Sequence, residues 1–244
     1  MKENKYDQPA FFEQYSRMAR SVQGLEGAGE WHVLRRMLPD FRGKRVLDLG
    51  CGFGWHCRYA AEQGAAAVVG VDLSERMLEV ARERNRFDNV AYECKAIEDF
   101  EFVPDSFDVV VSSLAFHYLD SFDAVCERVY RCLSSGGVFV FSVEHPVFTA
   151  SGRQDWAYGD GGERLHWPVD RYFSPGRREA CFLGESVTKY HRTVEEYVGC
   201  LLARGFALKG LAEPQPDEKA VRDVPGMADE LRRPIFLILS AVKA

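Results

Sequence analysis

The sequence lacks any run of apolar residues long enough to cross a bilayer, which takes about 20 residues. Its N-terminus, MKENKYDQPAFFEQY, is polar and has none of the apolar core of a secretory signal peptide. Both absences argue against a membrane span and against export. They predict a cytoplasmic location.

An excess of positive charge is also missing. The chain has 31 Lys and Arg against 37 Asp and Glu, which gives a formal net charge of −6 at pH 7. Phosphate backbones select basic surfaces, so we expect no nucleic-acid partner. With 46% hydrophobic and 28% charged residues, the composition is that of an ordinary globular protein, and it favours no particular oligomeric state.

Cysteine pairs at metal-binding spacing are absent as well. The seven cysteines are odd in number and irregularly spaced, which favours reduced thiols over a disulfide framework. Cys51 and Cys57 lie near each other, but Cys51 sits among glycines and no CxxC or HxxxH motif accompanies the pair. We therefore predict no metal site.

From Lys44 onward, strand-like and helix-like segments alternate, which predicts an α/β domain with a parallel sheet and helices on both faces. Residues 1–43 precede it as a helical cap, with helical pattern over 10–38. In the core, 44–143, we expect strands at 45–49, 67–71, 90–94, 107–112 and 137–143, and helices at 55–63, 75–86 and 122–133.

The alternation stops after residue 143. Residues 144–192 combine Gly, Pro and aromatic residues with weak periodicity, which predicts a lid or substrate-binding segment. Residues 193–244 return to regular structure, with a helix at 193–204 and apolar runs at 206–212 and 235–242 around a Pro-rich charged loop. We find no internal repeat, and we expect one domain over 1–244.

The most informative segment is VLDLGCGFGWHCRYA, in which an apolar run opens into Gly50, Gly52 and Gly54. This pattern predicts a strand, a tight turn and a helix N-terminus, where a ligand can touch bare backbone. A dinucleotide-binding turn reads G-x-G-x-x-G, but Trp55 stands at the position of its third glycine and would obstruct the packing of helix on strand. The spacing therefore weighs against NAD and FAD.

Asp72 ends the next apolar run, about 20 residues past the glycines, where a carboxylate can accept both hydroxyls of a ribose. The alternative is a carboxylate at a helix N-terminus, next to a Ser74 cap and without a ligand. The glycine turn at the matching distance favours the ribose. The two features together predict a ligand with a ribose and no diphosphate.

With these features the chain resembles the class I S-adenosylmethionine-dependent methyltransferases. VLDLGCGFGWH is similar to their first motif, VVGVDLSERML to the second, FDVVVSSLAFHYL to the fourth-strand motif, and LSSGGVFVFSV to the fifth strand. The resemblance implies a Rossmann-like sheet of seven strands, mostly parallel with an antiparallel last strand, to which 206–212 and 235–242 contribute. It also implies S-adenosyl-L-methionine as cofactor and S-adenosyl-L-homocysteine as product.

The resemblance further assigns cofactor-binding roles. It places the methionine part against the glycine turn, with Asp48 facing its amino group directly or through water. It places the ribose on Asp72, and a backbone carbonyl after the fourth strand near the sulfonium. The residues are Asp48, Gly50, Cys51, Gly52, Asp72, Leu73, Met77, Ser113 and Leu114. For Asp48 the alternative is a structural acceptor for N–H groups of the loop.

The adenine end departs from the family pattern, because Ala96 and Ile97 stand where many relatives have an acidic residue followed by Ala. The Ile97 N–H can reach a ring nitrogen, which leaves Glu98 or Asp99 to accept from the exocyclic amine. Tyr15 and Arg20 lie on the helical cap. In several relatives such a segment closes over the methionine carboxylate, so the resemblance implies that these two residues contact it. Plain packing of Tyr15 and a solvated Arg20 are the alternatives.

Methyl transfer is a direct displacement, so the enzyme aligns the reacting groups and in some cases removes a proton. His117 is the main candidate base, because it follows the fourth strand at the edge where α/β sites open. Local packing is its alternative. His145 is a weaker candidate at the end of the fifth strand, on the same edge. His191, which precedes the helix at 193–204, is another, with capping of that helix region as its alternative.

These observations predict methyl transfer to O, N or C of a small molecule. The aromatic residues of 144–192 favour an aromatic or amphipathic acceptor, although rings that simply pack a loop are the alternative. Two other classes stay open, an NAD(P)-dependent oxidoreductase and a cofactor-binding module without turnover.

Overall fold

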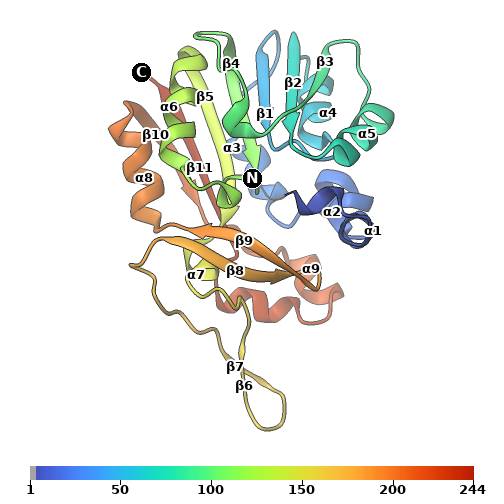
Figure 1. Ribbon diagram of the computed structural model, residues 1–244, viewed down its shortest axis with the longest axis vertical. Coiled ribbons are helices and arrows are strands. Elements are labelled where there is room, and N and C mark those ends of the chain that lie inside the picture. The colour runs from blue at the N-terminus through green and yellow to red at the C-terminus, as the bar shows by residue number, and fades with distance from the viewer. Residues whose placement is uncertain (1–3) are drawn as a thin grey trace.

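A seven-stranded sheet forms the centre of the molecule (Figure 1). The computed structural model describes residues 4–244, apart from the side chain of Lys219. The spatial order is β10-β11-β5-β4-β1-β2-β3, in which β11 runs antiparallel to both neighbours and the other pairs are parallel. The predicted sheet is confirmed, including its antiparallel last strand. Its strands are β1 (Arg45–Leu49), β2 (Ala67–Asp72), β3 (Val90–Cys94), β4 (Phe107–Ser113), β5 (Leu133–Glu144), β10 (Phe206–Ala212) and β11 (Phe236–Lys243).

Helices cover both faces of the sheet, because its inner strands carry apolar side chains on both sides. Phe139 and Phe141 of β5 pack on one face with residues of α6 and α8. Val46 and Val109 pack on the other face with residues of α4 and α5, and Trp31 of α3 joins the same layer. These helices are α3 (Trp31–Met37), α4 (Trp55–Glu62), α5 (Glu75–Arg84), α6 (Phe122–Cys132) and α8 (Val194–Ala203).

The N-terminal segment lies beside the sheet end at which β2 finishes (Figure 1). Asn4 donates a hydrogen bond to the Leu73 carbonyl at 3.3 Å, and Asp7 accepts from the Ser74 hydroxyl and the Arg76 N–H. These contacts hold the segment over the turn after β2. Its elements are η1 (Lys5–Asp7), α1 (Pro9–Ser16), α2 (Ala19–Val22) and η2 (Gly24–Gly27).

The region 144–192 contains regular structure that weak periodicity failed to predict: α7 (Pro146–Thr149), the hairpin of β6 (Ala157–Tyr158) with β7 (Arg164–His166), and the hairpin of β8 (Gly176–Phe182) with β9 (Glu185–His191). Leu183 and Gly184 both have positive φ, as a two-residue hairpin turn of type I′ requires. Three buried positions of this hairpin are Arg178, Lys189 and His191. Because these buried residues are polar, the sequence of the hairpin does not show the alternation of apolar and polar residues that predicts a half-buried strand.

The hairpin β8–β9 lies across the end of the sheet, and β6–β7 projects from the far end of the molecule (Figure 1). The segment predicted as a Pro-rich loop contains α9 (Glu218–Asp223) and η5 (Met227–Arg232). Asp217 caps α9 by accepting the Ala220 N–H at 2.7 Å. An Asp at an N-cap is a helix signal, but the many prolines and charged residues around it favoured a loop in the sequence.

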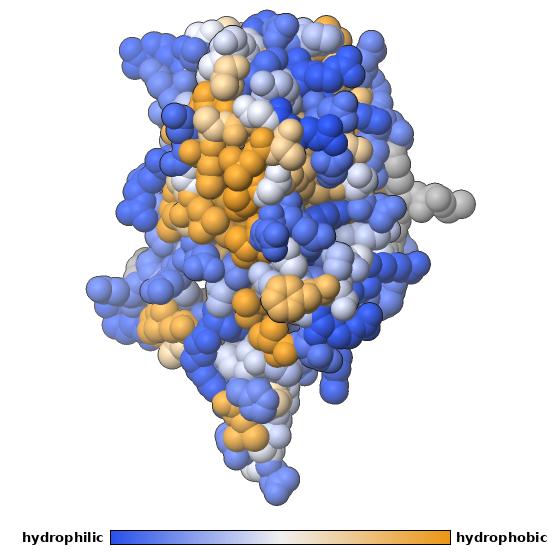
Figure 2. Space-filling model, turned by 90° about the vertical axis from the view of Figure 1, so that its left-hand side faces the viewer, coloured by the Kyte–Doolittle hydropathy of each residue, from blue (hydrophilic) through white to orange (hydrophobic). Residues whose placement is uncertain are grey.

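Figure 2 shows apolar residues gathered on the face that carries α8 and the edge strand β10. Leu202 of α8 and Leu211 of β10 are about half exposed, at 55% and 46%. Within residues 4–244, no helix has the length and apolar character that a membrane span needs.

Candidate active site

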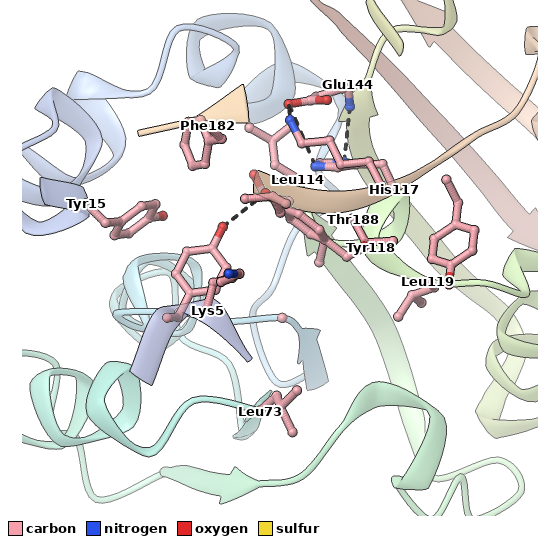
Figure 3. A pocket seen from close by; sticks show the side chains of 18 of the residues that line it. Lys5, Tyr15, Leu73, Leu114, His117, Tyr118, Leu119, Glu144, Phe182 and Thr188 are labelled. Atoms are coloured by element: carbon pink, nitrogen blue, oxygen red, sulfur yellow. Dashed lines mark hydrogen bonds and ion pairs between the residues drawn. The ribbon is translucent and has the colours of Figure 1, made fainter. Parts of the chain in front are cut away.

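A cavity of about 1090 Å³ opens at the carboxyl ends of β1, β2, β4 and β5, the edge at which open α/β sheets bind ligands. Residues of the N-terminal segment and of the hairpin β8–β9 line it together with the strand ends. Figure 3 shows Tyr15, Tyr118 and Phe182 around this space. The cavity therefore joins the expected cofactor residues to a segment far along the chain.

The glycine turn after β1 has the backbone that its sequence predicts. Gly50, Gly52 and Gly54 have φ of 76°, 52° and 75°, values that favour glycine. A Cβ on Gly50 would lie 2.4 Å from the Cβ of Ala115, and one on Gly54 would lie 2.4 Å from the hydroxyl of Tyr92. Gly50 and Gly52 line the cavity, so a ligand can meet bare main chain here.

Asp72 lies at the end of β2 and lines the cavity beside this turn. Its Oδ2 accepts the Gly52 N–H at 2.8 Å, and its Oδ1 accepts the Ser74 N–H at 2.9 Å. Burial raises the pKa of Asp72, and the two N–H groups oppose that rise. A carboxylate oxygen has two lone pairs, so each can still accept a ribose hydroxyl. Leu73 and Met77 line the cavity beside it.

The segment expected at the adenine end is η3 (Ile97–Asp99), in which Ile97 and Glu98 line the cavity and Asp99 is not among the lining residues. Arg128 donates to the Glu98 carbonyl and holds this short helix against α6. Of the two acceptors left open for the exocyclic amine, the placement favours Glu98.

Arg20 and Glu30 form an ion pair in the cavity wall, with Arg20 Nη2 2.6 Å from Glu30 Oε1. Ser113 Oγ donates to the same oxygen at 3.1 Å, while Glu30 Oε2 is buried without a partner among the described residues. Tyr15 also lines the cavity. Sequence reasoning missed Glu30, because nothing in its spacing connects it to Ser113, 83 residues further along the chain.

Ser113 and Leu114 line the cavity where β4 ends. Leu114 has a φ of 55°, which is uncommon for a residue with a side chain. Its N–H donates to the Ser142 carbonyl at 2.9 Å, which fixes the turn against β5. Such backbone strain is concentrated at functional sites.

Asp48 and Cys51 lie beneath the glycine turn and are not among the residues that line the cavity. Asp48 is 1% exposed and accepts from the Cys57 thiol at 3.3 Å, because the alternation of β1 turns its side chain towards α4. Burial raises the pKa of Asp48 to about 7 and that of Cys51 to about 11. The structure thus does not place the Asp48 side chain where the resemblance expects it.

Another part of the cavity wall contains a polar cluster that joins the hairpin to the sheet (Figure 3). Lys189 Nζ of β9 lies 2.6 Å from Glu144 Oε1 of β5 and 3.0 Å from Gln154 Oε1. Gln154 Nε2 donates to Glu144 Oε2 at 2.9 Å. Burial pushes the pKa of Glu144 up, but His117 and Lys189 bring it below its usual value, so this group is a carboxylate at neutral pH.

His117, in η4 (Phe116–Tyr118), lines the cavity next to this cluster. Its Nδ1 accepts the Glu144 N–H at 3.4 Å, which leaves the proton of the neutral ring on Nε2, 4.0 Å from Glu144 Oε1. Burial lowers the pKa of His117 to about 4. The ring is therefore neutral at pH 7, the state that a base requires, but its unprotonated nitrogen faces the main chain.

His145 and His191 are buried and do not belong to the cavity lining. His145 caps α7 through Nδ1, and its Nε2 lies 2.7 Å from Glu213 Oε1. His191 contacts Thr149 Oγ1 at 2.8 Å and the Tyr172 carbonyl at 2.9 Å, one with each ring nitrogen. Both rings connect segments of the chain, and neither is placed to act on a molecule in the cavity.

The residues present fit S-adenosylmethionine. The glycine turn exposes main chain, Asp72 retains acceptor capacity, and Glu30 has an unpartnered charged oxygen in the cavity wall. Within residues 4–244, the side chains of His, Cys, Asp and Glu form no group of three or more that could hold a metal ion.

Comparisons with known proteins identify the family of this chain. A methyltransferase domain model matches residues 47–141. A Listeria monocytogenes structure described as an S-adenosylmethionine-dependent methyltransferase is 57% identical, with a TM-score of 0.86, over 91% of this chain and 99% of that one. Another from Mesorhizobium loti is 44% identical, with a TM-score of 0.83, over 90% of this chain and 100% of that one. A malonyl-[acyl-carrier protein] O-methyltransferase of Enterobacter lignolyticus is 37% identical over 196 residues, 80% of this chain and 68% of that protein. The chain therefore belongs to the class I S-adenosylmethionine-dependent methyltransferases and is an enzyme that uses this cofactor.

Proposed function

We propose that the protein transfers the methyl group to an oxygen, nitrogen or carbon of a small aromatic or amphipathic molecule. The observation that carries this proposal is the continuation of the cavity from Ser113 and Leu114 to the hairpin β8–β9, where Tyr118 and Phe182 supply ring faces. Ring faces bind apolar groups and also cations. At about 1090 Å³ the cavity is larger than most single-ligand pockets, which supports joint binding of cofactor and acceptor.

Glu144, Lys189 and Gln154 give this space a polar anchor. The side chain of Glu144 is 13% exposed, and that of its partner Lys189 is 2% exposed, so the carboxylate is the more accessible half of the pair. A hydroxyl or amine of the acceptor could donate to it. The Enterobacter relative is named as an O-methyltransferase, which supports oxygen as the first acceptor atom to test.

The bound cofactor supplies a methyl group on a sulfonium, and no covalent nucleophile from the protein is required. The work of this chain is to align the acceptor, exclude water and take up a proton where the acceptor carries one. The hairpin β8–β9 and the N-terminal segment close the two sides of the cavity. Glu144 is the carboxylate near enough to this space to take up a proton, and His117 Nε2 lies 4.0 Å from its Oε1. The free thiols fit a single domain that works in the cytoplasm.

The test is incubation with methyl-labelled S-adenosylmethionine and a metabolite extract, followed by separation of small molecules from macromolecules. We expect label in a small molecule, and less transfer by Phe182→Ala at unchanged S-adenosylhomocysteine affinity. Phe173→Ala is the matched control, since that ring lies in the same region and is 86% exposed. Label confined to protein or nucleic acid would contradict the proposal, as would equal loss of cofactor binding and transfer in Phe182→Ala.

A further inference from the structure

Glu30 has an unusual position for a carboxylate. The residue is 1% exposed and lines the cavity, at the N-cap of α3. Its Oε1 is occupied by Arg20 and Ser113, whereas its Oε2 is buried with no partner among residues 4–244. A buried oxygen of a charged group is costly when nothing donates to it.

The surroundings of Glu30 keep it ionised. Burial alone would raise its pKa, but the Arg20 guanidinium and the backbone N–H of Glu30 together outweigh that effect and hold the pKa below its usual value. His56 brings no second positive charge, because burial lowers its pKa to about 4. The unpartnered oxygen therefore belongs to a carboxylate that one cation only partly satisfies.

The pair also offers a free cationic side to the cavity. The Arg20 side chain is 23% exposed, and it lines the cavity together with Glu30. A guanidinium has five N–H donors in a planar fork, and Nη2 is the nitrogen that donates to Glu30. A carboxylate of a ligand can thus bind Arg20 without breaking the ion pair.

We propose that Arg20 and Glu30 together form the receptor for the α-amino-acid end of the cofactor, with Glu30 Oε2 accepting from its ammonium and Arg20 donating to its carboxylate. A zwitterion placed head to tail against an ion pair satisfies all four charges. Glu30 takes the role that the resemblance gave to Asp48, whose side chain is not in the cavity lining. The inference rests on the cofactor and is independent of the acceptor proposed above.

This receptor makes the amino-acid end a determinant of ligand selection. 5′-Methylthioadenosine shares the adenosine and the thioether of S-adenosylhomocysteine but has no amino-acid end. It can bind the glycine turn and Asp72, and it leaves Glu30 Oε2 buried and unsatisfied. We therefore expect the wild-type protein to prefer S-adenosylhomocysteine strongly over 5′-methylthioadenosine.

Calorimetric titration of the full chain with both ligands tests the proposal. Glu30→Gln keeps the shape of the side chain and removes its charge. We expect it to weaken S-adenosylhomocysteine about tenfold or more, the loss of one charge-assisted hydrogen bond, and to leave 5′-methylthioadenosine unchanged. Glu13→Gln is the matched control, because Glu13 is an exposed carboxylate on the same segment that pairs with Arg17, and it should change neither affinity.

Equal weakening of both ligands by Glu30→Gln, or no change in either, would overturn the assignment. It would also fail if Asp48→Asn abolished the preference while Glu30→Gln retained it. Should Glu30→Gln not fold, the wild-type protein is titrated with the S-adenosylhomocysteine analogue that lacks the α-amino group. This analogue should lose about tenfold or more in affinity, and equal binding would contradict the role of Glu30. No acceptor is present in these titrations, so they are unaffected if the proposed acceptor is wrong.

Discussion

Asp72 accepts the N–H of Gly52 at 2.8 Å and thereby ties the end of β2 to the turn that follows β1. One carboxylate thus both shapes the glycine turn and faces the cavity. Asp72→Ala removes this contact together with the expected ribose contact. We predict that it weakens S-adenosylhomocysteine by about 2–4 kcal/mol in calorimetric titration, with Glu79→Gln on the exposed side of α5 as a neutral control. Unchanged affinity would remove the ribose assignment.

The protonation of His117 gives a second prediction. Burial lowers its pKa to about 4, below the value of about 6.5 in an unfolded chain. Because the unfolded state then binds the proton more readily, the fold loses stability as the pH falls from about 6.5 towards 4. His117→Gln should reduce the loss of unfolding free energy between pH 7 and pH 4.5 by about 2 kcal/mol. Urea unfolding at both pH values measures this, and an NMR titration midpoint near the ordinary histidine pKa would refute it.

The buried pair of Lys189 and Glu144 gives a third prediction. Removing one partner leaves an uncompensated charge, so Glu144→Gln or Lys189→Met should each cost about 3–5 kcal/mol of unfolding free energy. Combining the two should cost clearly less than the sum of the single changes, and urea unfolding of all three variants measures the coupling. Glu179→Gln breaks an exposed pair on the same hairpin and should cost less than about 1 kcal/mol. Strict additivity in the double variant would show that the pair is not coupled.

Asp48 should make the apoprotein less stable at high pH. Burial raises its pKa to about 7, so the neutral form is favoured in the fold, and the contribution present below the unfolded pKa is lost as the pH rises through 7. Asp48→Asn should therefore raise the unfolding free energy by about 2 kcal/mol more at pH 8 than at pH 5. Thermal or urea unfolding at the two pH values measures it. A gain that is equal at both would mean that Asp48 is ionised in the fold.

The part of the cavity formed by the glycine turn and Asp72 was predictable from the sequence, because its features are local. A glycine turn between strand and helix is a local feature, since the positive φ of Gly50, Gly52 and Gly54 is a property of those residues themselves. The position of Asp72 follows from the next parallel strand, which must finish at the same edge. The placements of Gly50, Gly52 and Asp72 in the cavity lining follow from these two rules.

The side of the cavity that the hairpin β8–β9 lines was not predictable in the same way. The hairpin β8–β9 has regular alternation, but its inward positions include Arg178 and Lys189, which read as solvent-facing in a sequence. Arg178 is buried because backbone carbonyls such as that of Ala150 accept from it at 2.9 Å, and Lys189 because Glu144 neutralises it. These partners lie 28 and 45 residues away, so no local pattern announces them.

The sequence by itself determined the strand–turn–helix unit, the acidic residue that follows it and the alternation of strands and helices, because backbone preference and strand alternation act over a few residues. Only the tertiary structure decided that Asp48 turns beneath the turn, that Glu30 reaches Ser113, and that a hairpin closes the cavity over Glu144. Those features depend on pairing buried charges between distant segments. The free energy of a buried charge is set by its partners, and the partners are fixed only when the chain has folded.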